Sequence, residues 1–283
     1  MFKRFIPLLV LLFTFAVVGA AFADTEDEII AKYLKKAEKQ RKHKIYFASA
    51  SFAYGKLPTE SDYTMFYHYS NRNIDPGSPL TGIWRSKQLA LNIGMMVTQK
   101  VSVRLGFEYW FKLGSDAVGD FDFGIAPLGL QEDFELNSKI QVMGITGGVE
   151  YHLMNPPTDE GIINSISVRV GGGGGFYFAK WDIWDGANSF NLSTETYETN
   201  IEPLKGSAPG ASVWLGVDYP VGLLGLVFGG EVNYLYLNLD DVHSYNSLGE
   251  ELYVSYSDNP DDRVGLDLSG LRGRVELKRY LRW

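Results

Sequence analysis

Residues 89–113 constrain the fold of this chain more than any other segment, because apolar and polar side chains alternate along them. The odd-numbered residues are apolar from position 89 to 97 and again from 101 to 113, whereas the residues between them are mostly small, polar or charged. A period of two over about ten residues is typical of a β-strand with two chemically different faces. Two such strands across the polar turn at 98–100 predict an antiparallel hairpin.

Six further segments alternate in the same way, so the sequence predicts eight antiparallel strands. The expected strands are approximately 45–55, 89–97, 101–113, 139–153, 165–180, 208–219, 224–238 and 271–283. Short turns follow the second, fourth and sixth strands, and long connections follow the first, third, fifth and seventh. A barrel inserted from one side of a membrane has this asymmetry. We therefore predict an all-β fold, an eight-stranded antiparallel up-and-down transmembrane β-barrel.

The apolar parity of these strands is predicted to face outward. An eight-stranded barrel has an interior just wide enough for its own side chains, and the apolar side chains are too many and too bulky to fit there. The other parity consists of Gly, Ser and Ala with scattered charged residues, which suits a narrow polar lumen. An apolar exterior implies contact with lipid.

The first 23 residues have the organisation of a secretory signal peptide. Lys3 and Arg4 precede an apolar stretch at 5–18, and Ala21 and Ala23 form a small-x-small cleavage site. Removing this segment would change the formal charge from −8 to −10, because it carries two bases and no acid. The chain contains no Cys, so the exported protein would have neither a disulfide framework nor a site for a lipoprotein acyl anchor.

Residues 24–43 have a helical rather than a strand-like period. Thr25 and Glu28 form a capping-box pattern, and apolar residues then recur at helical spacing toward a basic end. This predicts a short periplasmic amphipathic helix, followed by the barrel at 44–283. The helix could cap the barrel mouth, lie on anionic phospholipid head groups or bind a periplasmic partner. The sequence leaves these alternatives open.

The last strand carries the residues on which a family resemblance rests. It ends in the aromatic residue Trp283, and apolar residues share its parity at Val275, Leu277 and Leu281, whereas Arg279 departs from the pattern. Together with the eight-strand architecture, this ending resembles that of small eight-stranded bacterial outer-membrane β-barrel proteins of the OmpA, OmpX and OmpW type. The resemblance implies location in the bacterial outer membrane, with the N-terminal helix and the C-terminus periplasmic. It also implies that the outer-membrane assembly machinery recognises this terminal pattern.

Ten charged residues fall on the parity that is predicted to face the lumen. They are Arg104, Glu108, Glu150, Arg169, Asp218, Glu231, Arg272, Arg274, Glu276 and Lys278. Unpaired charges in a narrow lumen would cost free energy, so we expect a polar network of ion pairs and hydrogen bonds. In this network, bases of the last strand would meet carboxylates of other strands. The pattern is compatible with a structural polar core and with a selective or gated pathway lined by the same groups.

The glycine run at 171–175 is not interpreted as a phosphate-binding loop. No Lys-Ser/Thr pair follows it, and it falls inside a predicted strand rather than before a helix. Glycines in a barrel strand instead leave room for bulky neighbours, here Trp110 and Trp214.

His68 and Ser70 are candidate catalytic residues. The segment from His68 to Asn71 resembles the His-x-Ser-Asn signature of outer-membrane lipid A deacylases and phospholipases. The resemblance implies that His68 acts as the base and Ser70 as the nucleophile. The segment falls in the first long external connection rather than on a well-marked strand, so a solvated loop is the alternative interpretation.

The charge and the residue types narrow the choice of partners. The negative net charge disfavours nucleic acid. The acidic loops lack the spacing of a dedicated calcium loop, so we expect no metal and no cofactor. The expected partners are outer-membrane lipid and lipopolysaccharide and the assembly machinery, with a small apolar ligand as a further alternative.

The function that the sequence favours is non-enzymatic. It predicts an outer-membrane protein with a structural or surface-interaction role, or a narrow passive conduit for small molecules. The alternative function is an outer-membrane lipid hydrolase that uses His68 and Ser70.

Overall fold

A computed structural model describes the chain from residue 44 to residue 282, with interruptions. The described ranges are 44–59, 61–66, 75–78, 82–113, 116–121, 132–157, 165–185, 189–191, 196–198, 203–221, 225–245, 248–249, 251–254 and 263–282. The predicted signal peptide at 1–23 and the predicted helix at 24–43 lie outside the described residues.

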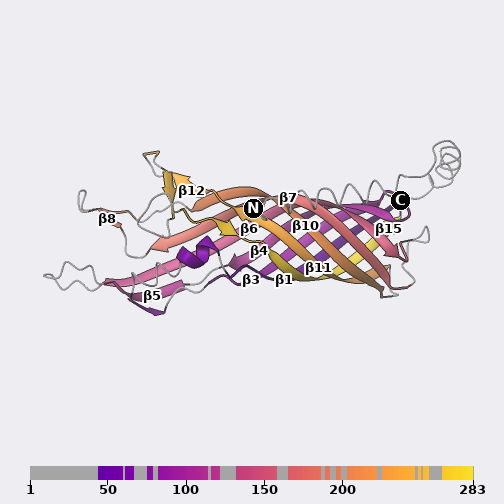
Figure 1. Cartoon of the computed structure of the whole chain (residues 1–283), viewed down its shortest axis with the longest axis horizontal. Helices are drawn as coiled ribbons and strands as arrows, with labels where there is room; N and C mark the ends of the chain where they lie inside the picture. Colours follow the sequence, from indigo (N-terminus) through magenta and orange to yellow (C-terminus); the bar gives the residue numbers. More distant parts are fainter. Residues whose placement is uncertain are drawn as a thin grey trace.

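Eight long antiparallel strands close into a barrel (Figure 1). They are β1 (Ile45–Lys56), β3 (Arg85–Met96), β4 (Val101–Leu113), β6 (Glu132–Met154), β7 (Ser167–Asp185), β10 (Leu204–Pro220), β11 (Leu226–Leu239) and β15 (Gly270–Arg282). Each strand pairs with the next in this order. The first and last strands close the sheet, with Ile45 opposite Arg282 and Gly55 opposite Arg272. The predicted fold class is confirmed.

Shorter strands lie in the connections. They are β2 (Asp75–Ser78), β5 (Asp116–Phe121), β8 (Ser189–Asn191), β9 (Thr196–Glu198), β12 (Val242–Tyr245), β13 (Glu251–Tyr253) and β14 (Leu266–Asp267). β5 pairs with β6, and β12 pairs with both β10 and β13. A single helical turn occupies residues 62–66. In the part of the chain that the structure describes, no helix has the length and apolar character needed to cross a membrane.

The apolar parity of the strands faces outward, as the sequence predicts. Ile93 on β3 and Leu105 on β4 are directly opposite each other, and their side chains are 65% and 63% exposed. Asn92, on the other parity of β3, is 4% exposed and donates a hydrogen bond to Ser49, which lies directly opposite it on β1. A barrel that exposes its large apolar side chains and buries its polar ones is adapted to lipid on the outside.

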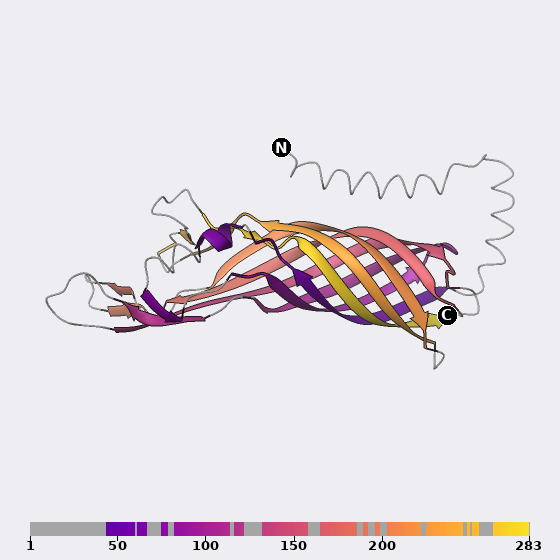
Figure 2. The same ribbon diagram turned by 60° about the horizontal axis from the view of Figure 1, so that its bottom comes forward.

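Three strands are much longer than a membrane requires. β6 has 23 residues, β7 has 19 and β10 has 17, whereas a strand of about 9–11 residues spans a bilayer. β6 and β7 project beyond the other barrel strands, together with β5, at the end opposite the short turns (Figure 2). The segment 114–137, which from the sequence is expected to be a loop, contains β5 and the first residues of β6. Outside the membrane both faces of a strand can meet water, so the alternation that signals a strand fades there.

The interior of the barrel is filled by three layers of side chains. A turn-side apolar layer consists of Ile45, Phe47, Val227 and Tyr280. A charged layer follows toward the middle of the barrel. A larger loop-side apolar layer consists of Leu57, Tyr63, Phe66, Trp110, Leu113, Ile140, Val142, Tyr177, Ala179, Trp181, Leu204, Ala208, Leu235, Leu237, Leu239, Val242, Val264, Leu266 and Leu268. The predicted polar lumen therefore corresponds to the middle layer only, because both ends of the interior are apolar.

A lysine on the lipid-facing surface of β4 tests the orientation of the strands. Leu105→Lys is expected to destabilise the folded barrel by about 2–4 kcal/mol, because a cation would lie in the hydrocarbon region. The free energy of unfolding in urea, measured with the barrel in phospholipid vesicles, reports the change. The control is Met65→Lys on the external turn 62–66, where the side chain is 45% exposed. We expect Met65→Lys to change the free energy by no more than about 0.5 kcal/mol. Equal effects of the two variants would contradict the assignment of Leu105 to the lipid-facing surface.

Candidate functional site

The ten charged residues predicted for the lumen all lie inside the barrel. Each of them is at most 9% exposed. Five are bases, namely Arg104, Arg169, Arg272, Arg274 and Lys278, and five are acids, namely Glu108, Glu150, Asp218, Glu231 and Glu276. The five positive and five negative formal charges cancel, which is the condition for keeping so many ionised groups in a dry interior.

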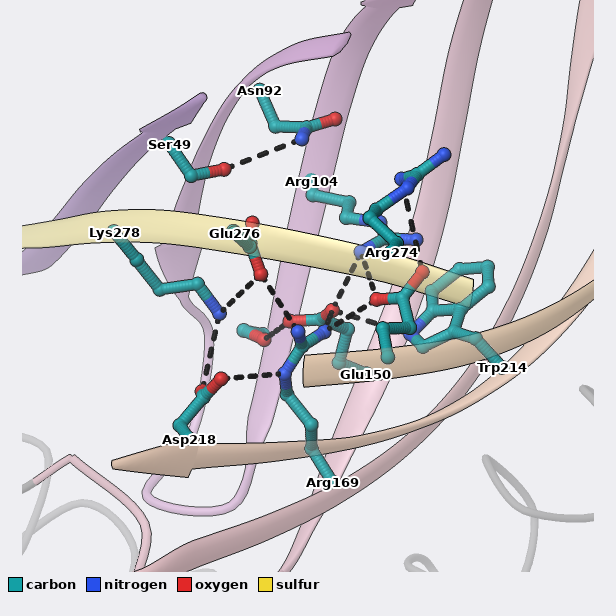
Figure 3. A network of polar contacts seen from close by, with 12 residues as sticks. Ser49, Asn92, Arg104, Glu150, Arg169, Trp214, Asp218, Arg274, Glu276 and Lys278 are labelled. Carbon is teal, nitrogen blue, oxygen red and sulfur yellow. Dashed lines mark hydrogen bonds and ion pairs between the residues drawn. The ribbon is translucent and has the colours of Figure 1, made fainter. Parts of the chain in front are cut away.

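Arg169 on β7 lies at the centre of the charged layer (Figure 3). Its Nη1 atom donates hydrogen bonds to Glu150 and, at 2.9 Å, to Glu231. Its Nε atom donates to Asp218 at 3.2 Å, and its Nη2 atom donates to Glu276 at 2.7 Å. These carboxylates belong to β6, β11, β10 and β15. One guanidinium group therefore connects five of the eight barrel strands.

Arg104 and Trp214 complete the environment of Glu150. Arg104 Nη1 donates to Glu150 at 3.0 Å and to Glu231 at 3.1 Å. The Arg104 guanidinium lies 3.7 Å from the centroid of the Trp214 ring, a cation–π arrangement. Trp214 Nε1 and Ser102 Oγ also donate to Glu150, at 3.2 and 3.1 Å. The Glu150 carboxylate thus accepts hydrogen bonds from four side chains.

The bases of the last strand do not all bind carboxylates. Arg274 Nη2 donates to Glu108 at 2.7 Å, and Lys278 Nζ donates to Asp218 at 3.2 Å. Arg272 Nη1 instead donates to the side-chain carbonyl of Gln88 at 3.1 Å. The Arg272 guanidinium also lies 4.2 Å from the centroid of the Trp110 ring. Its Nη2 atom donates to the backbone carbonyl of Leu268 at 3.2 Å, so Arg272 is held by two carbonyl groups and an aromatic face rather than by an acid.

A small cavity lies where the charged layer meets the loop-side apolar layer. Its volume is about 10 Å³, and its lining includes Arg104, Glu108, Tyr177, Asn233 and Arg272. This is about the volume that a single water molecule needs. Asn233 Oδ1 and Arg272 Nε are buried and make no hydrogen bond within the described protein. The described part of the interior has room for a water molecule there, but not for a larger solute.

The turn at 62–66, a described part of the first external connection, covers the loop end of the barrel interior. Tyr63 and Phe66 of the turn at 62–66 pack against Trp181, with ring centroids 5.6 and 5.5 Å from that ring. Tyr63 Oη and Ser138 Oγ are hydrogen bonded at 2.9 Å, and Trp181 Nε1 donates to the same Ser138 oxygen. Burial raises the pKa of Tyr63 to about 12, so its hydroxyl remains protonated at neutral pH. Apolar and hydrogen-bonded contacts together fix this connection over the interior.

Several predicted residues are not part of this network. His68, Ser70 and Trp283 lie outside the described residues, so the catalytic assignment and the terminal aromatic stay predictions. Val275 and Leu277 lie on the outer face of β15, each 50% exposed, and Leu281 on the same face is 37% exposed. These three side chains are directed at lipid and take no part in the interior.

The neutral partners in the network were not predicted from the sequence. Gln88, Ser102 and Trp214 share the inward parity of their strands, but nothing in the sequence marks them as partners of particular charges. The central place of Arg169 was not predicted either, because the bases of the last strand were expected to bind the carboxylates. A signal that could have drawn attention to Arg169 is Gly216, which lies directly opposite it on β10 and where a Cβ atom would come within 2.9 Å of the Arg169 guanidinium.

These features define a closed, small β-barrel of the outer-membrane type. No protein-family model matches the chain, and no curated protein matches it. Among solved structures, the chain is similar to the outer membrane protein OprG from Pseudomonas aeruginosa, with 15% identity and a TM-score of 0.45 over 85% of this chain and 97% of that one. It is similar to a major outer membrane protein from Thermus thermophilus, with 15% identity and a TM-score of 0.43 over 84% and 99% of the two chains. It is also similar to Neisserial surface protein A, with 10% identity and a TM-score of 0.40 over 84% of this chain and 97% of that one.

Replacing Arg169 tests the importance of the central contact. Arg169→Met should lower the free energy of unfolding by about 3–5 kcal/mol, because several buried carboxylates lose their compensating charge. The control is Arg263→Met, which removes a 42% exposed arginine that also binds a carboxylate through two hydrogen bonds. A surface ion pair of this kind contributes at most about 1 kcal/mol. Urea titrations in vesicles measure both variants, and a loss for Arg169→Met no larger than for the control would contradict the role of Arg169.

Proposed function

We propose that this protein is a closed structural barrel of the bacterial outer membrane that holds a surface-interaction platform outside the membrane. The observation that carries the proposal is the filled interior. The charged layer is cross-linked through Arg169, and apolar layers cover it on both sides. A conduit would need an aqueous path, and paired charges packed between two apolar layers oppose one.

The proposed platform is the part of the chain that extends past the membrane. β6, β7 and β10 continue beyond the length that a bilayer requires, and β5 and β12 add to their edges. The loop-side apolar layer gives this region a core of its own. Long, well-packed external strands are costly to maintain for a protein that only spans the membrane, which supports an interaction role on this side.

The proposed orientation places both ends of the chain in the periplasm. Residues Lys44 and Arg282, the first and last described, lie at the same end of the barrel as the short turn at 97–100. Short turns are periplasmic in barrels inserted from that side. The proposal includes the division of the chain into a signal peptide at 1–23, a periplasmic helix at 24–43 and the barrel at 44–283.

Outward-facing bases near the external membrane surface support lipopolysaccharide as a lipid partner. Lys56 and Arg85 are directly opposite each other on β1 and β3, both exposed and one pleat beyond the exposed Tyr54. Lys180 and Lys205 are also directly opposite each other on β7 and β10, where Asp182 already forms an ion pair with Lys180 at 3.0 Å. Like charges directly opposite each other destabilise a sheet. An anionic group such as a lipid phosphate would relieve the repulsion.

The lipid proposal predicts a charge-dependent stabilisation by lipid A. Bisphosphorylated lipid A in the detergent micelle should raise the melting temperature of the barrel more than dephosphorylated lipid A does. The double variant Lys56→Gln/Arg85→Gln should lose much of that difference in melting temperature. Each base removed is expected to weaken the attraction to the lipid phosphates by about 1 kcal/mol. The control is Lys44→Gln/Lys100→Gln, which removes two exposed bases from the turn side. Similar responses of both double variants would reject the proposed site.

The closed-barrel proposal predicts the absence of ion conductance. Purified protein inserted into planar bilayers should give no stable unitary current steps, because the charged and apolar layers block the interior. Heat-modifiable migration on gels shows that the same sample is folded, and protease protection of the strands shows that it is inserted. Reproducible unitary steps from folded, inserted protein would overturn the closed barrel and favour the conduit.

A further inference from the structure

We propose that Asp241, His243 and Glu251 form a binding site for Zn²⁺ or a chemically similar divalent transition metal. The site lies on the external hairpin of β12 and β13, far from the charged layer of the barrel. It differs from the expectation drawn from the sequence, which was that the chain holds no metal.

The hairpin brings the three side chains to one place. Asp241 and His243 are two residues apart, so they lie on the same face of the chain as it enters β12. Glu251 begins β13 and is opposite Tyr245, which makes it a diagonal neighbour of His243. Asp241 Oδ1 is 2.8 Å from His243 Nδ1, and Glu251 Oε1 is 3.9 Å from the same nitrogen. One ligand atom from each residue lies within 4.8 Å of the other two.

These separations are close to those of a metal coordination shell. Zinc binds imidazole nitrogen and carboxylate oxygen at about 2.0–2.2 Å, so tetrahedral ligand atoms are separated by about 3.3 Å. The two measured separations, 2.8 and 3.9 Å, bracket that value. Small side-chain movements would place all three atoms around one ion. The neutral His243 ring would then carry its proton on Nε2 and coordinate the ion through Nδ1.

Arg263 holds the Glu251 carboxylate in a fixed orientation. Its Nη1 and Nη2 atoms donate to Glu251 Oε1 and Oε2 at 3.0 and 3.1 Å. The guanidinium group is a cation at every pH at which the barrel would be studied. The Arg263 guanidinium also lies 4.2 Å from the centroid of the Tyr253 ring. Hydrogen bonds to a ligating carboxylate are a general property of metal sites, because they orient the ligand before the ion binds.

The ligand types select the metal. Calcium and magnesium prefer shells made of oxygen atoms alone, whereas a nitrogen from His243 favours zinc and its neighbours among the transition metals. Asp241 and Glu251 supply two negative charges, and Arg263 offsets one of them. Three protein ligands on an exposed hairpin leave at least one coordination position for water or an external group.

A zinc titration of the full-length barrel folded in detergent micelles tests the proposal. Isothermal titration with zinc chloride, in a buffer free of chelators, should show one binding event per chain. His243→Ala and the nearly isosteric Glu251→Gln should each weaken binding by at least about tenfold. The control Asp240→Ala removes an adjacent carboxylate that is hydrogen bonded to Asn238, and it should bind zinc as the wild type does. Heat-modifiable migration confirms that each variant is folded.

Two further results decide the outcome. Cobalt chloride should give visible absorption bands of a low-symmetry four- or five-coordinate ion with the wild type and not with His243→Ala. Wild-type zinc binding that survives both ligand substitutions would overturn the proposal, as would no zinc binding by the wild type at millimolar concentration. Calcium chloride that binds as tightly as zinc chloride would overturn the assignment to a transition metal.

Discussion

The barrel depends on a guanidinium group that is removed from water at its centre. Arg169 is fully buried, and its ion pairs reach carboxylates on β6, β10, β11 and β15. Desolvating these charges is unfavourable, and their contacts with one another and with neutral donors such as Ser102 and Trp214 offset the cost. A shift of one residue between two strands would move the inward-facing charges of one strand to the lipid face. The network therefore makes misregistered closures unfavourable, and the closed arrangement is the one in which four carboxylates from four strands pair with Arg169.

The glycines of β6 and β7 create the space in which this network forms. A Cβ atom at Gly148 or at Gly171 would come within 2.4 Å of the Trp214 ring. Trp214 fits against the wall because those positions carry no side chain, and from there it donates to Glu150 and stacks with Arg104. Within the glycine run at 171–175, Gly171 is thus explained by close packing of this aromatic ring, whereas a Cβ atom at Gly173 or Gly175 would collide with the backbone of β6. Side chains of the described strands fill the space beside these glycines and close the interior.

The sequence predicted those parts of the structure that lipid constrains. Between Leu89 and Leu113, and in the other alternating runs within the bilayer, the outer face must be apolar, so the alternation identified the strands and their orientation. The rule fails beyond the membrane. Leu235, Leu237 and Leu239 face inward because the external region has an ordinary apolar core. The partners of Arg169 were not predictable, because contacts across the lumen depend on the stagger of the closed barrel rather than on spacing along the chain.

The external region gains order from the same features that close the lumen. Tyr63 and Phe66 fix the first long connection against Trp181, and Asp62 accepts a hydrogen bond from the backbone of Gly265 in the last connection. β12 pairs with the extended part of β10, so the hairpin that carries His243 is attached to the barrel wall. A surface built in this way holds its side chains in fixed relative positions. Recognition of a phosphate or a metal ion requires that fixed geometry, and an unsupported loop would lose it to conformational entropy.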